Sequence, residues 1–157
     1  MSGRGARPTP TGFDHGLLDR RVTELGLRSV DAVAAGLHWG YVTSLRKGDL
    51  PCPGAKMLPD VAAFVKLSPR ELYAITDEDV TVCHLRHFRG WAMGEAAAAR
   101  GWKYGAYKGF EAGEPLSKDM STAAAWAKTA KVFKVSPDEM RRAWEASRRL
   151  SVVPVPS

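Results

Sequence analysis

Cysteine and histidine gather at one place in the chain, where Cys83, His84 and His87 fall close together. His84 and His87 are three positions apart, so a helix would place both on one face. Thiolate and imidazole are zinc ligands, but a structural zinc ion needs four ligands and no second cysteine pair lies nearby. We therefore predict neither a bound metal nor a cofactor.

Motifs that carry catalysis are missing from the sequence. It has no paired carboxylates, nucleophile elbow, phosphate-binding glycine loop or zinc-protease signature. Its glycines stand singly, in places where helices would end. We predict that the protein is not an enzyme.

The sequence contains two copies of one helical pattern, and these helices position its other polar residues. Gly36 and Gly101 are 65 positions apart, and so are Gly48 and Gly113, whereas Ser68-Pro69 and Ser136-Pro137 are 68 apart. The copies therefore differ by a three-residue insertion in the loop after the third helix. Two small domains of the same fold would tolerate such a loop insertion.

Hydrophobic spacing, serine caps and glycine stops predict five helices in each copy, with Ser29 capping the second helix. The first copy has predicted helices at 16–25, 29–35, 39–47 and 55–66 and a fifth that begins at Ser68-Pro69; the second has them at 80–89, 92–100, 103–112, 118–133 and 137–149. The predicted fold class is thus all-α.

The predicted domain boundaries follow changes in composition. Residues 1–12 form a flexible basic arm, 13–76 the first domain, 80–150 the second domain and 151–157 a disordered tail. The acidic run Asp77-Glu78-Asp79 lies at the boundary between the domains. Arg4 and Arg7 in the arm either reach into a DNA groove or belong to a solvated tail.

The composition favours a polyanionic partner and a cytoplasmic location. The formal net charge is +6 and the pI about 9.5. No apolar run approaches the roughly 18 residues of a membrane span, and the N-terminal segment lacks the features of a secretory signal. Cys52 and Cys83 are too few to staple a chain of this length, so we expect reduced thiols.

The second copy carries Arg86, Gly90, Glu95-Ala96, Gly101 and the segment 107–113 in one characteristic order, over roughly residues 82–146. With these residues it resembles the Cro-like phage-repressor family, also called the xenobiotic-response-element type of helix-turn-helix domain. The resemblance implies two tandem five-helix lambda-repressor-like domains.

The resemblance also implies specific pairings. In the family, an arginine of the first helix pairs with the glutamate that ends the third helix, and Arg86 and Glu111 occupy those positions. In the first copy Arg46 stands where Glu111 stands, so we expect no such pair there, with Arg46 facing solvent or phosphate. Ser29 matches a polar phosphate-contacting position near the start of the second helix, whereas the second copy has Met93 there.

The third helix of each copy is the predicted DNA-reading element, because a helix fits the major groove and presents its first residues to base edges. The predicted readers are His38, Trp39, Gly40, Thr43 and Ser44 in the first copy and Lys103, Tyr104, Gly105, Lys108 and Gly109 in the second. Val42, Leu45, Tyr107 and Phe110 are predicted to face the core.

Cations flank the predicted reading helices. Arg46, Lys47 and Lys56 would clamp phosphates beside the first, with solvated surface charge as the competing interpretation. Residues 80–157 hold thirteen basic and seven acidic side chains, against eight and seven in 13–76. The second copy should therefore attract DNA more strongly, although its glycines offer few reading side chains.

The sequence thus predicts a sequence-specific regulator of double-stranded DNA, most simply a repressor of phage, plasmid or bacterial origin that acts in the cytoplasm at the nucleoid. Three arrangements stay open: both reading helices act from one chain, one copy binds DNA while the other contacts a protein, or a homodimer offers four reading helices. The alternatives are a protein-interaction module, such as an antitoxin or anti-repressor, and an architectural protein that coats DNA with little sequence preference.

Overall fold

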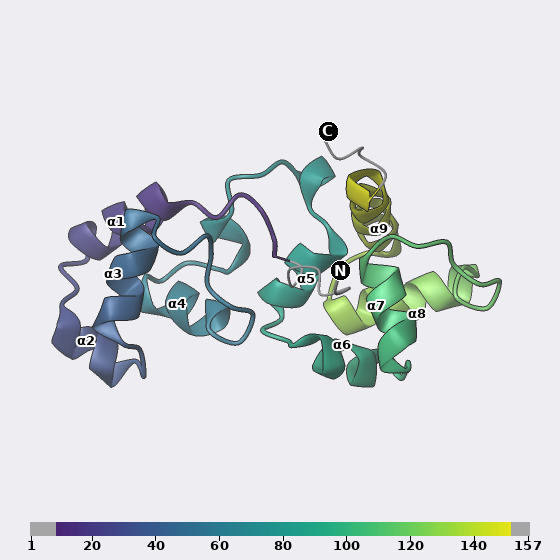
Figure 1. Ribbon diagram of the computed structural model, residues 1–157, viewed down its shortest axis with the longest axis horizontal. Helices are drawn as coiled ribbons and strands as arrows, with labels where there is room; N and C mark the ends of the chain where they lie inside the picture. The colour runs from purple at the N-terminus through teal and green to yellow at the C-terminus, as the bar shows by residue number, and fades with distance from the viewer. Residues whose placement is uncertain (1–8, 152–157) are drawn as a thin grey trace, which may run out of the picture.

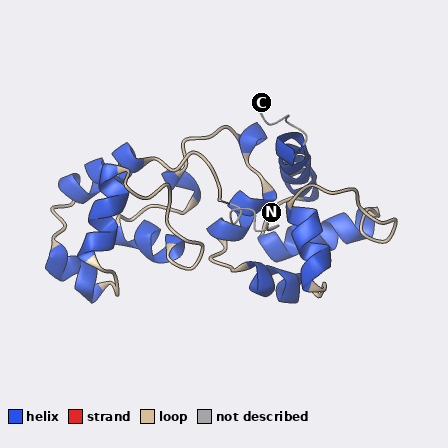
Figure 2. Ribbon diagram, in the orientation of Figure 1, coloured by secondary structure: helices blue, strands red, loops and turns tan. Residues whose placement is uncertain are grey.

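The computed structural model describes residues 9–151, and all regular secondary structure in this range is helical (Figures 1 and 2). The α-helices of this range are α1 (His15–Glu24), α2 (Ser29–Ala34), α3 (Trp39–Lys47), α4 (Leu58–Phe64), α5 (Val82–Phe88), α6 (Met93–Arg100), α7 (Tyr104–Glu111), α8 (Ala123–Phe133) and α9 (Pro137–Ser151), and the 3₁₀ helices are Arg70–Leu72 and Asp77–Asp79. The predicted all-α class is confirmed for these residues.

The first half of the chain packs around its own hydrophobic core. On α1, Leu18 and Val22 are four positions apart and share a buried face, which packs against α3. Val42 and Leu45 of α3 are fully buried, as predicted. The Asp14 carboxylate begins α1 by accepting a hydrogen bond of 2.9 Å from the Leu17 amide.

The second half has a core of its own, richer in aromatic rings. Tyr107 and Phe110 of α7 are buried, as predicted, and Phe110 lies 6.1 Å from Trp126 of α8 between ring centroids. The apolar face of α9 covers this core through Met140 and Ala143. Five α-helices surround the second core, in agreement with the predicted number.

The first half departs from the predicted five helices. Ser68-Pro69 starts only the 3₁₀ turn Arg70–Leu72, after which Tyr73 is extended and forms an isolated bridge with Phe13. The Arg70 guanidinium stabilises this path by donating to the carbonyls of Tyr73 (3.0 Å) and Ile75 (2.8 Å). The prediction of a fifth α-helix in the first half is therefore wrong.

Two other local predictions need correction. The helix expected from residue 118 begins at Ala123, because the Thr122 hydroxyl caps it by accepting from the Ala125 amide at 3.0 Å. Ser29 is the first residue of α2 and not its cap. The Asp31 carboxylate instead accepts from the Arg28 amide at 2.8 Å.

The predicted arm and tail fall mostly outside the described residues. Residues 1–8 of the arm and 152–157 of the tail are not described, and Ser151 is the last residue of α9. At the inner end of the arm, Pro10 is buried and the Gly12 carbonyl accepts from the Ala74 amide at 2.8 Å. Residues 10–12 therefore pack against the segment that joins the two halves.

The two halves contact each other through a seam of aromatic residues. Tyr73 belongs to the first core, and its ring lies edge-on to His84, with centroids 5.4 Å apart, and 5.5 Å from Phe88. Phe88 and Ile75 pack against both cores. No helix of residues 9–151 has the length and hydrophobicity to cross a membrane.

Candidate nucleic-acid interface

The α3 helix buries one face and exposes small and polar groups on the other. Of the predicted readers, His38 and Gly40 are exposed, and Trp39, Thr43 and Ser44 are half-buried. Lys47, at the last position of α3, is exposed. The outward face of α3 therefore offers hydroxyl, imidazole and ammonium groups, which are hydrogen-bonding partners for base edges and phosphates.

The α7 helix exposes cations beside an aromatic ring. Lys103, Tyr104, Gly105 and Lys108 are exposed, and Tyr104 has 54% of its surface accessible. The remaining predicted reader, Gly109, is half-buried beneath the Glu114 side chain. The outward face of α7 thus carries two ammonium groups and a phenol but few other side chains.

A buried ion pair holds α7 against α5. The Arg86 guanidinium donates to both carboxylate oxygens of Glu111, at 2.6 and 3.0 Å, and the two side chains are 6% and 2% exposed. Tyr107 adds a hydrogen bond of 2.8 Å to Glu111, and Arg86 also donates to the Trp91 carbonyl at 2.9 Å. The pair implied by the family resemblance is confirmed.

The electrostatics of this pair stabilise the charged form of the Arg86 guanidinium. Burial alone would lower the pKa of the Arg86 guanidinium, but the hydrogen bonds and negative charge of Glu111 outweigh it and raise that pKa. Burial first, and then the negative charge of Glu111, raise the pKa of the Tyr107 hydroxyl. Tyr107 therefore stays a neutral donor to the carboxylate.

The expectation that Arg46 has no ionic partner is wrong. Its Nε donates to the Asp19 carboxylate of α1 at 2.7 Å, and its guanidinium lies 5.7 Å from the centroid of the Trp39 ring. Both halves therefore join their first and third helices by an ion pair, with the charges exchanged. The Asp19–Arg46 pair is partly exposed, in contrast to the Arg86–Glu111 pair.

The other predicted phosphate contacts differ in their surroundings. Lys56 forms an ion pair with Glu95 of α6, so part of its charge is neutralised by the opposite half of the chain. The hydrogen bond from Lys56, followed by one from the Ala92 amide, lowers the pKa of Glu95. Ser29 is exposed on the first turn of α2, where a phosphate oxygen has access to it.

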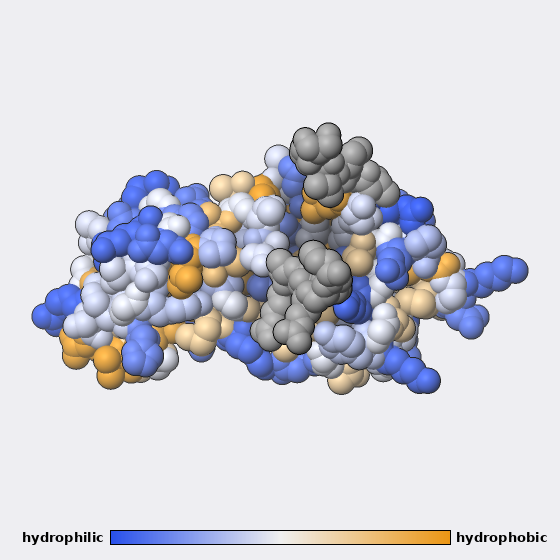
Figure 3. All heavy atoms as spheres, in the orientation of Figure 1, coloured by the Kyte–Doolittle hydropathy of each residue, from blue (hydrophilic) through white to orange (hydrophobic). Residues whose placement is uncertain are grey.

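The large aromatic side chains around the candidate interface are mostly covered. Trp39, Tyr41, Trp91 and Trp102 are half-buried, and arginines lie over the three indole rings. The surface does hold an apolar area that the sequence reasoning missed. Val30 and Val33 of α2 are 58% and 72% exposed, and Figure 3 shows an orange area at the lower left, where α2 lies. The sequence signal for this area was the three-residue spacing of Val30 and Val33 beside Ala32, which faces inward.

The histidines of α5 serve local structure. The Nδ1 of His84 accepts from the Thr81 amide at 3.0 Å, and its Nε2 donates to the Thr11 carbonyl at 2.7 Å. His87 is buried, and its Nδ1 has no hydrogen-bond partner among residues 9–151. Within the same range, no group of three or more His, Cys, Asp or Glu side chains is placed to hold a metal ion.

Acidification is expected to destabilise the protein through His87. Burial, then the charges of Arg86 and His84, lower the pKa of His87 to about 4, whereas a histidine in the unfolded chain has its ordinary pKa of 6.5. The unfolded state therefore binds more protons between these values, and the free energy of unfolding should fall by about 2 kcal/mol from about pH 7 to about pH 5. Urea unfolding at a series of pH values measures this loss.

The matched variant is His87→Leu, which removes the titrating group without breaking a described hydrogen bond at Nδ1. Its unfolding free energy should depend less on pH, with a residual slope from His84, whose pKa burial also lowers. An unchanged slope in the variant would show that His87 does not cause the acid sensitivity.

No protein-family model, curated protein or solved structure matches the chain. The candidate interface is therefore described by its own geometry. Ion pairs and apolar cores hold the buried faces of α3 and α7, and the opposite faces of both helices are exposed.

Proposed function

We propose that the protein is a sequence-specific regulator of double-stranded DNA, which represses transcription by occluding a promoter. One observation carries the proposal: α3 and α7 each follow a short helix after a glycine-containing turn, and each exposes one face while burying the other. These features support an interpretation as two tandem helix-turn-helix units, in which the second helix of each unit would enter the major groove.

The two proposed units contribute differently to DNA binding. Residues 80–157 carry most of the net positive charge, and the exposed Lys103 precedes α7 while the exposed Lys108 lies on it. The glycines of α7 leave few side chains to distinguish bases, so this unit supplies affinity for phosphates. Thr43 and Ser44 of α3 supply hydrogen bonds to base edges.

Charge removal on α7 should weaken binding to all DNA sequences. For a Lys103→Ala/Lys108→Ala variant we expect roughly tenfold weaker binding at physiological salt. The slope of the logarithm of the binding constant against the logarithm of the salt concentration (the salt slope) should become shallower by about 2, because each phosphate contact contributes about 0.9. Fluorescence anisotropy with a duplex selected from a random library, and with an unselected duplex, measures both quantities over a range of salt concentrations.

Hydroxyl removal on α3 should instead change the preference between sequences. A Thr43→Ala/Ser44→Ala variant is expected to keep the salt slope but to lose most of its preference for the selected duplex. Arg20→Ala is the matched control, since Arg20 is an exposed cation on α1, which lies at the top of the first half in Figure 1, away from the lower edge where α2 lies. Binding that does not depend on salt, or that responds equally to all three variants, would refute the proposal.

A second candidate is a protein-interaction module, such as an antitoxin or anti-repressor. The exposed valines of α2 favour it, because an apolar area on a surface helix marks a protein contact. A Val30→Lys/Val33→Lys variant separates the candidates: a regulator of DNA keeps its affinity for the selected duplex, whereas an interaction module loses its protein partner. A selection that yields no preferred sequence would favour the architectural alternative.

A further inference from the structure

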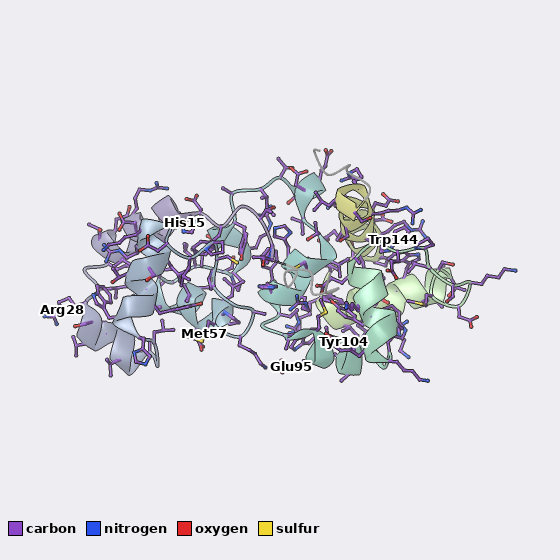
Figure 4. All side chains as sticks on the ribbon, viewed as in Figure 1. His15, Arg28, Met57, Glu95, Tyr104 and Trp144 are labelled. Carbon is purple, nitrogen blue, oxygen red and sulfur yellow. The ribbon has the colours of Figure 1, made fainter. Side chains whose placement is uncertain are left out.

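The two proposed reading units point the same way along the molecule. In Figure 1, α2 and α6 lie along the lower edge, and α3 and α7 both rise from that edge on the right of the preceding helix. Figure 4 places Glu95 of α6 and Tyr104 of α7 near this edge. In this view, a shift along the long axis brings one unit close to the orientation of the other.

This relation differs from that of a symmetric dimer. A two-fold axis turns one unit against the other, so that a symmetric dimer reads half-sites in opposite orientations, as an inverted repeat. Two units in the same orientation read half-sites in the same orientation, as a direct repeat. The orientation inside one chain thus determines which class of DNA site fits it.

The seam between the halves maintains this orientation. The edge-on contact of Tyr73 with His84 and its tilted contact with Phe88 join the first core to α5. The same His84 ring donates to the Thr11 carbonyl, so two segments of the first half, at Thr11 and at Tyr73, contact this ring. An aromatic pair of this kind contributes roughly 0.5–1.5 kcal/mol beyond the area that it buries.

The seam continues to the lower edge. Lys56, in the loop before α4, forms its ion pair with Glu95 on the first turn of α6, and Pro59 lies against Gly90 in the turn before α6. α4 itself packs against α5. The start of the second proposed unit is therefore braced by the first half of the chain.

From this arrangement we infer that one chain reads a single asymmetric site, made of two different half-sites in direct orientation. The inference rests on the proposed function, since it assumes that both α3 and α7 face DNA. The half-sites should differ because α3 offers the hydroxyls of Thr43 and Ser44 at the positions where α7 has Lys108 and Gly109. A second copy of the chain is not needed to complete the site.

The experiment starts from a duplex selected by the full chain from a random library of about 40 base pairs, long enough for two half-sites a helical turn or more apart. Three derivatives are compared with it: one with the second half-site inverted, one with about 5 base pairs inserted between the half-sites, and one with the second half-site scrambled. Affinity is measured by anisotropy, and the number of chains per duplex by sedimentation.

The expected result is one chain per duplex and affinity reduced at least tenfold by inversion and by the half-turn insertion, to the level of the scrambled derivative. In footprints, Thr43→Ala/Ser44→Ala should lose protection at one end of the site and Lys108→Ala at the other. A palindromic site with two chains per duplex, or affinity that inversion does not change, would overturn the inference while leaving the proposed function intact. Failure to select any duplex would refute the proposed function, and the inference with it.

Discussion

Replacing Glu111 with alanine is expected to lower the free energy of unfolding by about 3–5 kcal/mol, because it leaves the Arg86 guanidinium buried without its counter-charge. Arg86 is 6% exposed and donates two hydrogen bonds to the carboxylate. The Tyr107 hydroxyl would lose its acceptor as well. Urea unfolding followed by circular dichroism gives the loss directly.

The equivalent pair in the first half supplies the control. Arg46→Ala removes an ion pair that is partly solvated, so its cost should stay below about 1 kcal/mol. An Arg86→Met/Glu111→Leu double variant should recover much of the lost stability, because no unpaired charge remains in the core. If Glu111→Ala costs no more than Arg46→Ala, the buried pair does not hold α7 in place.

Replacing Gly113 with alanine should cost about 3 kcal/mol or more, since two penalties add. Gly113 has a φ of +77°, where an L-residue is strained by about 1–2 kcal/mol. A Cβ at Gly113 would also meet Arg148 Cα at 2.5 Å and the Ser147 carbonyl carbon at 2.8 Å, so α9 must move away from the end of α7. Urea unfolding measures the loss.

Gly101→Ala is the matched control for this substitution. Gly101 has nearly the same φ, +79°, but no atom lies within 4 Å of a Cβ placed there. Its replacement should therefore cost only the backbone strain, about 1–2 kcal/mol. Equal losses at the two positions would mean that α9 does not pack closely on the turn after α7.

Local signals in the sequence predicted most of the helices. Glycine stops and apolar spacing located α3 and α7 to within a residue or two, and identified Val42, Leu45, Tyr107 and Phe110 as core. These features depend on residues that are close in sequence, which is why periodicity and caps can reveal them. The all-α class follows from the same signals.

The Ser-Pro start signal failed once because it describes only the beginning of a helix. After Pro137 the chain continues into the amphipathic α9, whereas Pro69 is soon followed by Tyr73, Ile75 and Thr76, which form helix less readily. In the structure Tyr73 leaves the helical path and enters the seam. The competing stabilisation comes from the hydrogen bonds of Arg70 and from residues far away in the sequence, Phe13, His84 and Phe88, which a local helix pattern does not contain.

The charged residues of the candidate interface were predicted by position but not by partner. Arg46 pairs with Asp19, 27 positions away, and Lys56 with Glu95, 39 positions away. Such pairs depend on how helices and halves pack, so a sequence can indicate an exposed cation without showing what neutralises it. The buried Arg86–Glu111 pair was accessible only through a family resemblance.

The contacts of Tyr73 affect how far either half of the chain can be separated from the other. The Tyr73 ring of the first half packs against His84 and Phe88 of the second, and Phe88 and Ile75 pack against both cores. Either half alone would expose these rings to water, and exposed apolar surface favours aggregation. A fragment cut between the halves is therefore expected to be less stable and less well behaved in solution than the whole chain.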